Sequence, residues 1–331
     1  MINSLSSRSL IAVATAALLS VSTMTSAAEF EPKNPECIAP ASPGGGWDFI
    51  CRSTAKHLYE LGLIEQSMQV VNMSGGGGGV AYAHVTQKRD SDDNLIVAAS
   101  NGTTSRLAQG AYPNASVDDV HFLATFGAEY GAIAVAKNSP YKTLKQLMDK
   151  VVADPRSVAW SGGSAVGGFD HIKPLMLAKA AGLDDARKLK YVAYAGGGEA
   201  MTGLLSDAVQ VFSGDFSEVR GFVESGDIRI LAILSPKRLT GYEQFPTALE
   251  QGYDVVGPNW RGIYVPKNAS KESREFWSLA IEKMTRDPTF QQSLLDKGIE
   301  PFNNFGPDME AFIKANVTKI RNISKEIGII Q

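Results

Sequence analysis

The most constraining feature of this chain is a pattern that occurs four times: a short apolar stretch, then a cluster of glycines, then a helical pattern. The four clusters lie at residues 44–46, 75–79, 162–163 and 196–198. Glycine at a strand-to-helix turn lets bare backbone approach a ligand closely. The helix that starts beyond the turn offers unpaired N–H groups and the positive end of its macrodipole. Four such turns predict a binding site for an anion.

Short apolar strands alternate with helical patterns along the chain, which is typical of α/β proteins. The expected strands are 36–39, 69–72, 95–99, 132–136, 158–161, 189–193, 209–212, 228–234 and 262–265. The expected helices are 48–62, 143–153, 169–181, 199–206, 271–286 and 309–327. This order predicts mostly parallel sheets covered by helices on both faces.

The length of the chain predicts two lobes, because about 300 residues exceed the usual size of one hydrophobic core. We expect lobe 1 to comprise residues 29–127 plus 256–331 and lobe 2 to comprise residues 128–255, with the terminal helices packed back on lobe 1. In open α/β sheets, ligands bind beyond the carboxyl ends of the strands. All four glycine clusters occupy that kind of position, so the ligand cleft is expected between the lobes.

The residues expected to contact the ligand lie in or beside the strand-to-helix turns. They are Gly44, Gly45, Gly46, Trp47, Asp48, Gly76, Gly77, Gly78, Ser100, Asn101, Gly163, Ser164, Ala165, Gly197, Gly198, Glu199 and Asp215. The three acidic members have an alternative role that needs no ligand. Asp48 can cap the first helix, and Glu199 and Asp215 suit the macrodipole of the helices that follow them.

Four basic residues near the loops can meet an anion directly. They are Arg106, Lys173, Arg220 and Arg261. Arginine offers a bidentate fork for a carboxylate. None of the four lies inside a glycine cluster, however, and a surface salt bridge is the more common role for each.

The first 28 residues indicate a cleaved secretory signal peptide. Arg8 precedes an uncharged apolar run from Leu10 to Val21, and Ser26-Ala27-Ala28 offers small residues before the cut. That run is too short for a stable membrane anchor, although a short uncleaved anchor is the alternative. We therefore expect export to the periplasm.

The charge balance excludes nucleic acid as a partner. Removal of residues 1–28 takes away one arginine, so 32 basic residues become 31 against 35 acidic ones, a net charge of −4. This balance provides no basic surface for nucleic acid or for an anionic membrane.

The chain has only two cysteines, Cys37 on the first expected strand and Cys51 early in the following helix. In an oxidising compartment they can form a disulfide across the first glycine loop, worth about 3 kcal/mol for a ring of about 15 residues. Nearness in sequence does not guarantee the required geometry, so two separate buried thiols are the alternative.

Other site classes lack their motifs. A Walker loop needs a Gly-Lys pair, which does not occur, and no glycine cluster completes Gly-x-Gly-x-x-Gly. The nearest approach to a nucleophile elbow, residues 162–166, lacks its final glycine. The histidines His57, His84, His121 and His171 form no metal-binding pair and are expected on the surface or satisfied in the core. We expect no catalysis, no metal and no cofactor.

The order of these motifs resembles the substrate-binding proteins of tripartite tricarboxylate transporters, the Bug-type family. The resemblance covers nearly the whole mature chain. It rests on Pro43 to Asp48, Ser74 to Gly79, Ser161 to Ser164 and Tyr194 to Glu199, followed by Leu231 to Leu234 with Arg238, Pro246-Thr247 and Glu250 to Tyr253. It implies a two-lobed periplasmic binding protein that closes on a small carboxylate and delivers it to a membrane permease of one large and one small subunit. We expect it to act as a monomer.

One departure bears on the ligand. Many family members carry Asn-Arg-Pro-Gly-Ala-Gly-Gly at the second loop, whereas this chain has Asn72-Met73-Ser74 followed by five glycines. That form, with Glu36 to Pro40 and Arg261-Gly262, looks closest to the tricarboxylate-binding branch, which favours citrate or a related tricarboxylate. A binding protein for a dicarboxylate or an aromatic acid that acts in sensing is the alternative, and an exported hydrolase is a third class.

Overall fold

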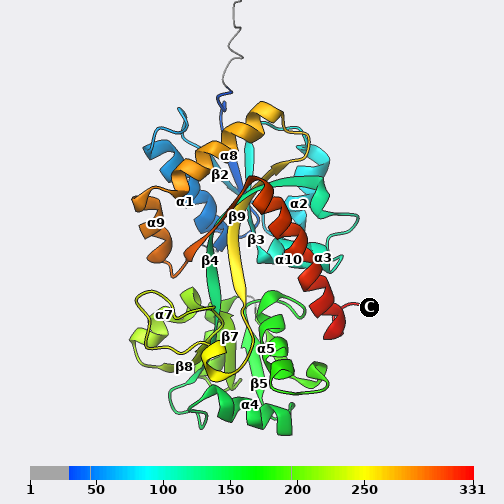
Figure 1. Ribbon diagram of the computed structural model, residues 1–331, viewed down its shortest axis with the longest axis vertical. Coiled ribbons are helices and arrows are strands. Elements are labelled where there is room, and N and C mark those ends of the chain that lie inside the picture. Colours follow the sequence, from blue (N-terminus) through cyan, green and yellow to red (C-terminus); the bar gives the residue numbers. More distant parts are fainter. Residues whose placement is uncertain (1–29, 45, 195) are drawn as a thin grey trace, which may run out of the picture.

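The computed structural model describes residues 30–44, 46–194 and 196–331, so the predicted signal peptide, Gly45 and Ala195 lie outside the described residues. Figure 1 shows two lobes joined by the long strands β4 (Val120–Ala136) and β9 (Pro258–Pro266). Only part of each of these strands was expected from the sequence. The expected segment 132–136 is the end of β4, and 262–265 is the second half of β9.

The upper lobe in Figure 1 is built on one half of a continuous sheet. Its strands β1 (Glu36–Ala39), β2 (Gln69–Asn72) and β3 (Leu95–Ser100) pair in parallel, in the order β2-β1-β3. Strand β9 then pairs antiparallel with β3, β4 pairs antiparallel with β9, and β10 (Glu300–Phe305) pairs antiparallel with β4.

The lower lobe repeats this scheme. Strands β5 (Ala159–Gly162), β6 (Lys190–Ala193) and β7 (Val211–Asp215) pair in parallel, in the order β6-β5-β7. The second half of β4 joins antiparallel to both β7 and β8 (Ile228–Ile233). The expectation of mostly parallel sheets therefore needs a correction. Each half of the sheet is mixed, because β9 runs antiparallel to β3 in the upper half and β4 runs antiparallel to β7 and β8 in the lower half.

The helices lie around the two sheet halves (Figure 1). In the upper lobe these are α1 (Gly46–Glu60), α2 (Gly79–Lys88), α3 (Asn101–Ala108), α8 (Lys271–Thr285) and α9 (Pro288–Leu295). In the lower lobe they are α4 (Leu144–Ala153), α5 (Phe169–Ala180), α6 (Gly197–Leu205) and α7 (Phe216–Glu224). Among the described residues, no helix is both long and apolar enough for a membrane span.

The terminal helix α10 (Gly306–Glu326) contacts both lobes. Its face with Met309 and Ile313 belongs to the same buried cluster as Val97 of β3, whereas Ile327, the residue after the helix, belongs to the cluster that contains Leu175 of α5. Most of the helix therefore packs on the first lobe, as expected, but its end lies on the second. The lobe boundaries at 127/128 and 255/256 stay proposals; the first falls inside β4.

Cys37 and Cys51 form a disulfide bond in the structure, with their Cα atoms 5.6 Å apart. The bond ties β1 to α1 on either side of the first glycine loop. Both residues are completely buried. A ring of this size is worth about 3 kcal/mol in the chain-entropy estimate, so the bond helps to fix the loop that follows β1.

Candidate functional site

A cavity of ≈ 610 Å³ lies between the lobes, and eight of the predicted ligand-binding residues line it. They are Gly46, Trp47, Gly77 and Ser100 on the first lobe and Gly163, Ser164, Ala165 and Asp215 on the second. A second cavity of ≈ 430 Å³ is lined by Gly44 and Asp48 and shares Gly46, Asp215 and Arg261 with the first. The structure thus brings together turns that are far apart in the sequence.

Other predicted residues line neither of these two cavities. They are Gly76, Gly78, Asn101, Gly197, Gly198 and Glu199. Asn101 is buried and accepts a hydrogen bond from Asn316, and Gly78 packs against Tyr112 and Trp47. Gly197 is pressed against the carboxyl group of Glu218, so its lack of a side chain makes room for that residue. Gly45 lies outside the described residues.

The first glycine loop is held by Asp48. This buried carboxylate accepts from Gly44 N at 2.8 Å, from Arg52 Nε at 2.9 Å and from Asn72 Nδ2 at 2.8 Å. Burial opposes ionisation, but these hydrogen bonds outweigh it and lower the pKa of Asp48. Asp48 lies inside α1, so it braces the loop within the protein and does not act as the helix N-cap.

The second glycine loop takes a backbone conformation that other residues rarely adopt. Gly77 has φ 62°, and its carbonyl accepts from Tyr112 Oη at 2.6 Å. A Cβ at this position would lie 3.1 Å from Nε of Arg106, so a side chain here would crowd this arginine. Arg106 is half-buried and lines the cavity, and no carboxylate of the described residues forms an ion pair with it.

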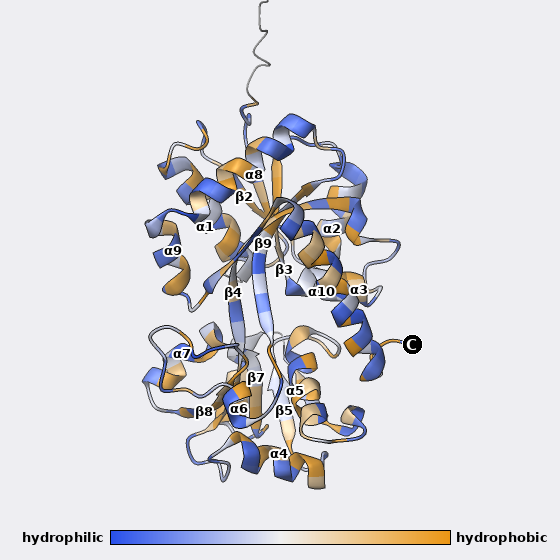
Figure 2. Cartoon of the chain, in the orientation of Figure 1, coloured by the Kyte–Doolittle hydropathy of each residue, from blue (hydrophilic) through white to orange (hydrophobic). Residues whose placement is uncertain are grey.

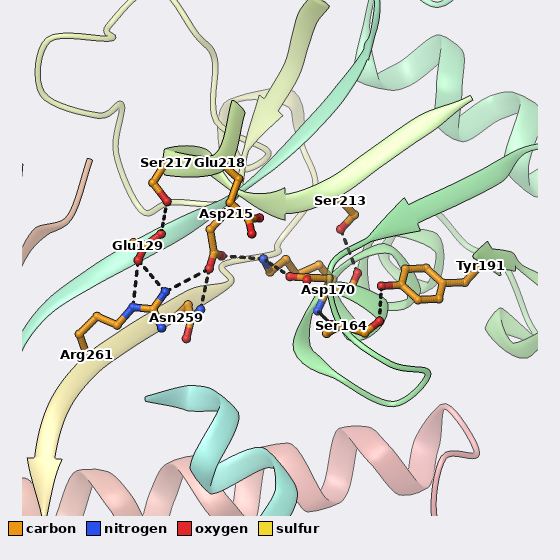
Figure 3. A network of polar contacts seen from close by, with 11 residues as sticks. Glu129, Ser164, Asp170, Tyr191, Ser213, Asp215, Ser217, Glu218, Asn259 and Arg261 are labelled. Carbon is orange, nitrogen blue, oxygen red and sulfur yellow. Dashed lines mark hydrogen bonds and ion pairs between the residues drawn. The ribbon is translucent and has the colours of Figure 1, made fainter. Parts of the chain in front are cut away.

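A buried network of charged side chains lies beside the cavity, where β4 and β9 cross between the lobes (Figure 3). Arg261 donates from Nε and Nη2 to Glu129 Oε1, at 2.9 Å and 2.6 Å. Lys173 Nζ lies 2.8 Å from Asp215 Oδ1 and 3.0 Å from Asp170 Oδ1. Figure 2 shows the hydrophilic colouring of this stretch of β9, which contrasts with the apolar strands inside the lobes.

The structure shows which partners the four basic residues near the loops have. Lys173 and Arg261 are buried partners of carboxylates, so a surface salt bridge is the wrong description of both. Arg220 donates to the backbone of Asp296 and approaches Glu224 at 3.9 Å on the surface. Arg106 is the one that faces the cavity without an acidic partner among the described residues.

In this buried network, the acidic side chains outnumber the basic ones. Lys173 and Arg261 face Glu129, Asp170, Asp215 and, beside them, Glu218, so full ionisation would leave a net charge of −2. Burial raises the pKa of Asp170, whereas Lys173 and Arg261 overcome burial and lower the pKa of Asp215. The pKa of Glu218 rises to about 8, because surrounding protein displaces solvent and because Asp170 and Asp215 lie nearby. A neutral Glu218 reduces the net charge to −1.

Several residues of the cavity wall were missed from the sequence, and three polar ones matter for the argument. They are Ser105, Glu218 and Asn259. Glu218 accepts from Asp215 N at 2.9 Å, and its spacing of three residues from Asp215 is a capping-box signal that could have revealed it. Ser105 and Asn259 carry no such signal. Their polar atoms Ser105 Oγ and Asn259 Oδ1 are buried without a hydrogen-bond partner among the described residues.

Ser164 does not have the surroundings of a nucleophile. Its Oγ accepts from Asp170 N at 3.0 Å, and no histidine of the described residues forms a hydrogen bond with it. His171 instead accepts from Gly167 N through Nδ1 at 3.0 Å, and burial lowers the pKa of its ring to about 4. His171 is therefore a satisfied core histidine, as its prediction stated.

Comparison with known proteins places this chain in a family. Protein BugT of Bordetella pertussis is 23% identical over 306 residues, which cover 91% of each chain. Among solved structures, a Rhodopseudomonas palustris protein with adipate has a TM-score of 0.76 at 20% identity, and MatC of the same species with bound malate has 0.74 at 17%. These two alignments cover 89% and 88% of this chain and 97% and 98% of the other. The model of the tripartite tricarboxylate transporter family receptor matches residues 50–329, and the chain therefore belongs to this family of periplasmic solute-binding proteins.

Proposed function

We propose that this protein binds a small carboxylate in the cavity between its lobes and delivers it to a membrane permease of one large and one small subunit. The observation that carries the proposal is the position of Arg106. This guanidinium lines the cavity, lies where a side chain at Gly77 would crowd it, and has no acidic partner among the described residues. An arginine in that situation can hold a carboxylate through charge-assisted hydrogen bonds.

Backbone groups from both lobes add to the anion site. The starts of α1, α3 and α5 all reach the cavity, through Gly46, Gly102 and Phe169. Helix N-termini favour negative charge. The start of α3 already has one of its N–H groups paired, because Ser100 Oγ accepts from Gly102 N at 3.0 Å. The others add to the attraction of Arg106 for an anion.

We propose citrate or a related tricarboxylate as the preferred ligand. The support is the sequence of the glycine loops together with a cavity of ≈ 610 Å³, which has room for a ligand of this size. The solved relatives named above carry malate and adipate, which are dicarboxylates. Dicarboxylates are therefore the competing ligand class. The periplasm is the proposed location, with residues 1–28 as the signal peptide that directs export.

Calorimetric titration of the exported protein tests this proposal. Citrate, isocitrate, tricarballylate, succinate and glutamate are added in turn, in the presence of a chelator. We expect at least one of them to bind without metal, and Arg106→Gln to weaken that binding at least about tenfold, equivalent to about 1.4 kcal/mol. The matched control is Arg156→Gln, since Arg156 is exposed and lines neither cavity. Failure of every carboxylate to bind would overturn the proposal.

A further inference from the structure

The cavity has one wall that offers hydrogen-bond acceptors, opposite in character to Arg106. Asp170, Asp215, Glu218 and Asn259 all line it, and each presents oxygen atoms. Fully ionised carboxylates are acceptors only, so a ligand made only of carboxylates has nothing to donate to this wall. This wall therefore predicts that the ligand has a hydrogen-bond donor in addition to its negative charge.

Asn259 gives the first indication of what the ligand must supply. Its Nδ2 donates to Asp215 Oδ2 at 2.6 Å, which fixes the orientation of the amide because a carboxylate oxygen can only accept from it. The other amide atom, Oδ1, is buried and accepts from no group among the described residues. Buried polar atoms are normally hydrogen-bonded. An acceptor left open beside a binding cavity calls for a donor on the ligand.

Glu218 gives the second, independent indication. Its Oε2 accepts from Asp215 N at 2.9 Å, whereas no hydrogen bond of Oε1 exists among the described residues. Two glycines shape the space around this carboxyl group, because a Cβ at Gly197 or at Gly214 would collide with it. The two glycines thus leave room for the Glu218 carboxyl group at the edge of both cavities, where its Oε1 can accept a hydrogen bond from a ligand.

We propose that Glu218 and Asn259 make this protein select small carboxylates that also carry a hydroxyl group. The inference rests on the proposed function of the cavity. A hydroxyl group is both donor and acceptor, so it can pair with Asn259 Oδ1 and with Glu218 in either protonation state. The corresponding methylene group leaves both unpaired, and sites built to bind a substrate hydroxyl discriminate strongly against the analogue that lacks it.

Matched pairs of ligands test the selection directly. Citrate and tricarballylate differ by one hydroxyl group, as do malate and succinate. We expect calorimetry at pH 7 to show the hydroxy acid of at least one pair binding at least about tenfold more tightly. Glu218→Leu should reduce that ratio several-fold, and Glu218→Gln should keep most of it, because the amide can still accept from Asp215 N and donate to a hydroxyl. The control is Glu224→Leu, at an exposed position on the same helix.

The outcomes separate this inference from the proposed function. Equal affinity for the hydroxy and deoxy members of both pairs would overturn the hydroxyl selection while leaving a carboxylate receptor intact. An unchanged ratio in a folded Glu218→Leu protein that still binds tricarballylate would remove Glu218 from the selection. Tighter binding of aspartate than of malate would show that the acceptor wall recognises an ammonium group instead. Absence of all carboxylate binding would refute the proposed function itself.

Discussion

The ammonium nitrogen of Lys173 lies 2.8 Å from Oδ1 of Asp215, and neither side chain has more than a trace of exposure. The same ammonium lies 3.0 Å from Oδ1 of Asp170. One lysine of α5 therefore balances carboxylates that follow two different turns beside the cavity. Desolvation of the lysine opposes its charge, but these two carboxylates raise its pKa. The arrangement links the third glycine loop to the start of α7.

Lys173→Met should destabilise the protein by about 3–5 kcal/mol, because it leaves Asp170 without its cation and Asp215 with only Arg261, at 3.6 Å. Urea unfolding followed by circular dichroism measures the loss. Lys145→Met is the matched control: Lys145 also lies 2.8 Å from a carboxylate, that of Asp149, but this pair is exposed. The control should change stability by no more than about 0.5 kcal/mol. Similar losses in the two variants would contradict a structural role for the buried pair.

Gly197→Ala should weaken carboxylate binding through Glu218. The added methyl group has no room beside the Glu218 carboxyl group, so that group must move away from Asp215 N. We expect an affinity loss of several-fold with little change in the fold. Gly221→Ala on α7 is the control, because a Cβ there meets nothing within 4 Å. If calorimetry gave the wild-type affinity for Gly197→Ala, the position of Glu218 would not matter for the ligand.

Gly77→Val should fold but lose at least about tenfold in affinity, equivalent to about 1.4 kcal/mol. Valine is disfavoured at φ 62°, and its side chain would push against the guanidinium of Arg106. Circular dichroism checks the fold before calorimetry. Gly182→Val offers a comparison of backbone strain alone, since Gly182 has φ 91° and open space around it. An equal effect of both variants on affinity would argue against a local role of the second loop.

Much of the fold could be predicted from local patterns. The expected strands at 36–39 and 69–72 coincide with β1 and β2, because each is a short apolar run between breakers. Strand β10 was missed, since Pro301, Asn303 and Asn304 give it no strand pattern and only its pairing with β4 makes it a strand. The first half of β4 was missed because glycine, threonine and glutamate interrupt its apolar pattern.

The site was predictable where backbone conformation requires a particular residue. The glycine loops stand out for that reason, and three of them reach the cavity, through Gly46, Gly77 and Gly163. The ion pair of Glu129 and Arg261 could not be found in this way, because the two residues are 132 positions apart and meet only when β4 pairs with β9. Asn259 likewise lies beside Glu129 only because β9 pairs with β4, so its place at the site could not be read from the local sequence. Tertiary pairing, and no local motif, determines these contacts.

Affinity for a polycarboxylate should fall as the pH rises through about 8, where Glu218 titrates. Below that pH the group is neutral, and above it a further negative charge is added to the acidic cluster beside the ligand. The stability of the protein should change with pH in the same direction. A carboxyl group whose pKa is raised on folding contributes its full stabilisation below its unfolded pKa, and for Glu218 this contribution is lost as the pH rises through about 8.

Calorimetry with tricarballylate between about pH 7 and 9, where the ligand stays ionised, measures the effect on binding. Glu218→Gln should flatten the profile, whereas Glu224→Gln should leave it unchanged. A profile of equal slope in the wild type and in Glu218→Gln would assign the titration to another group.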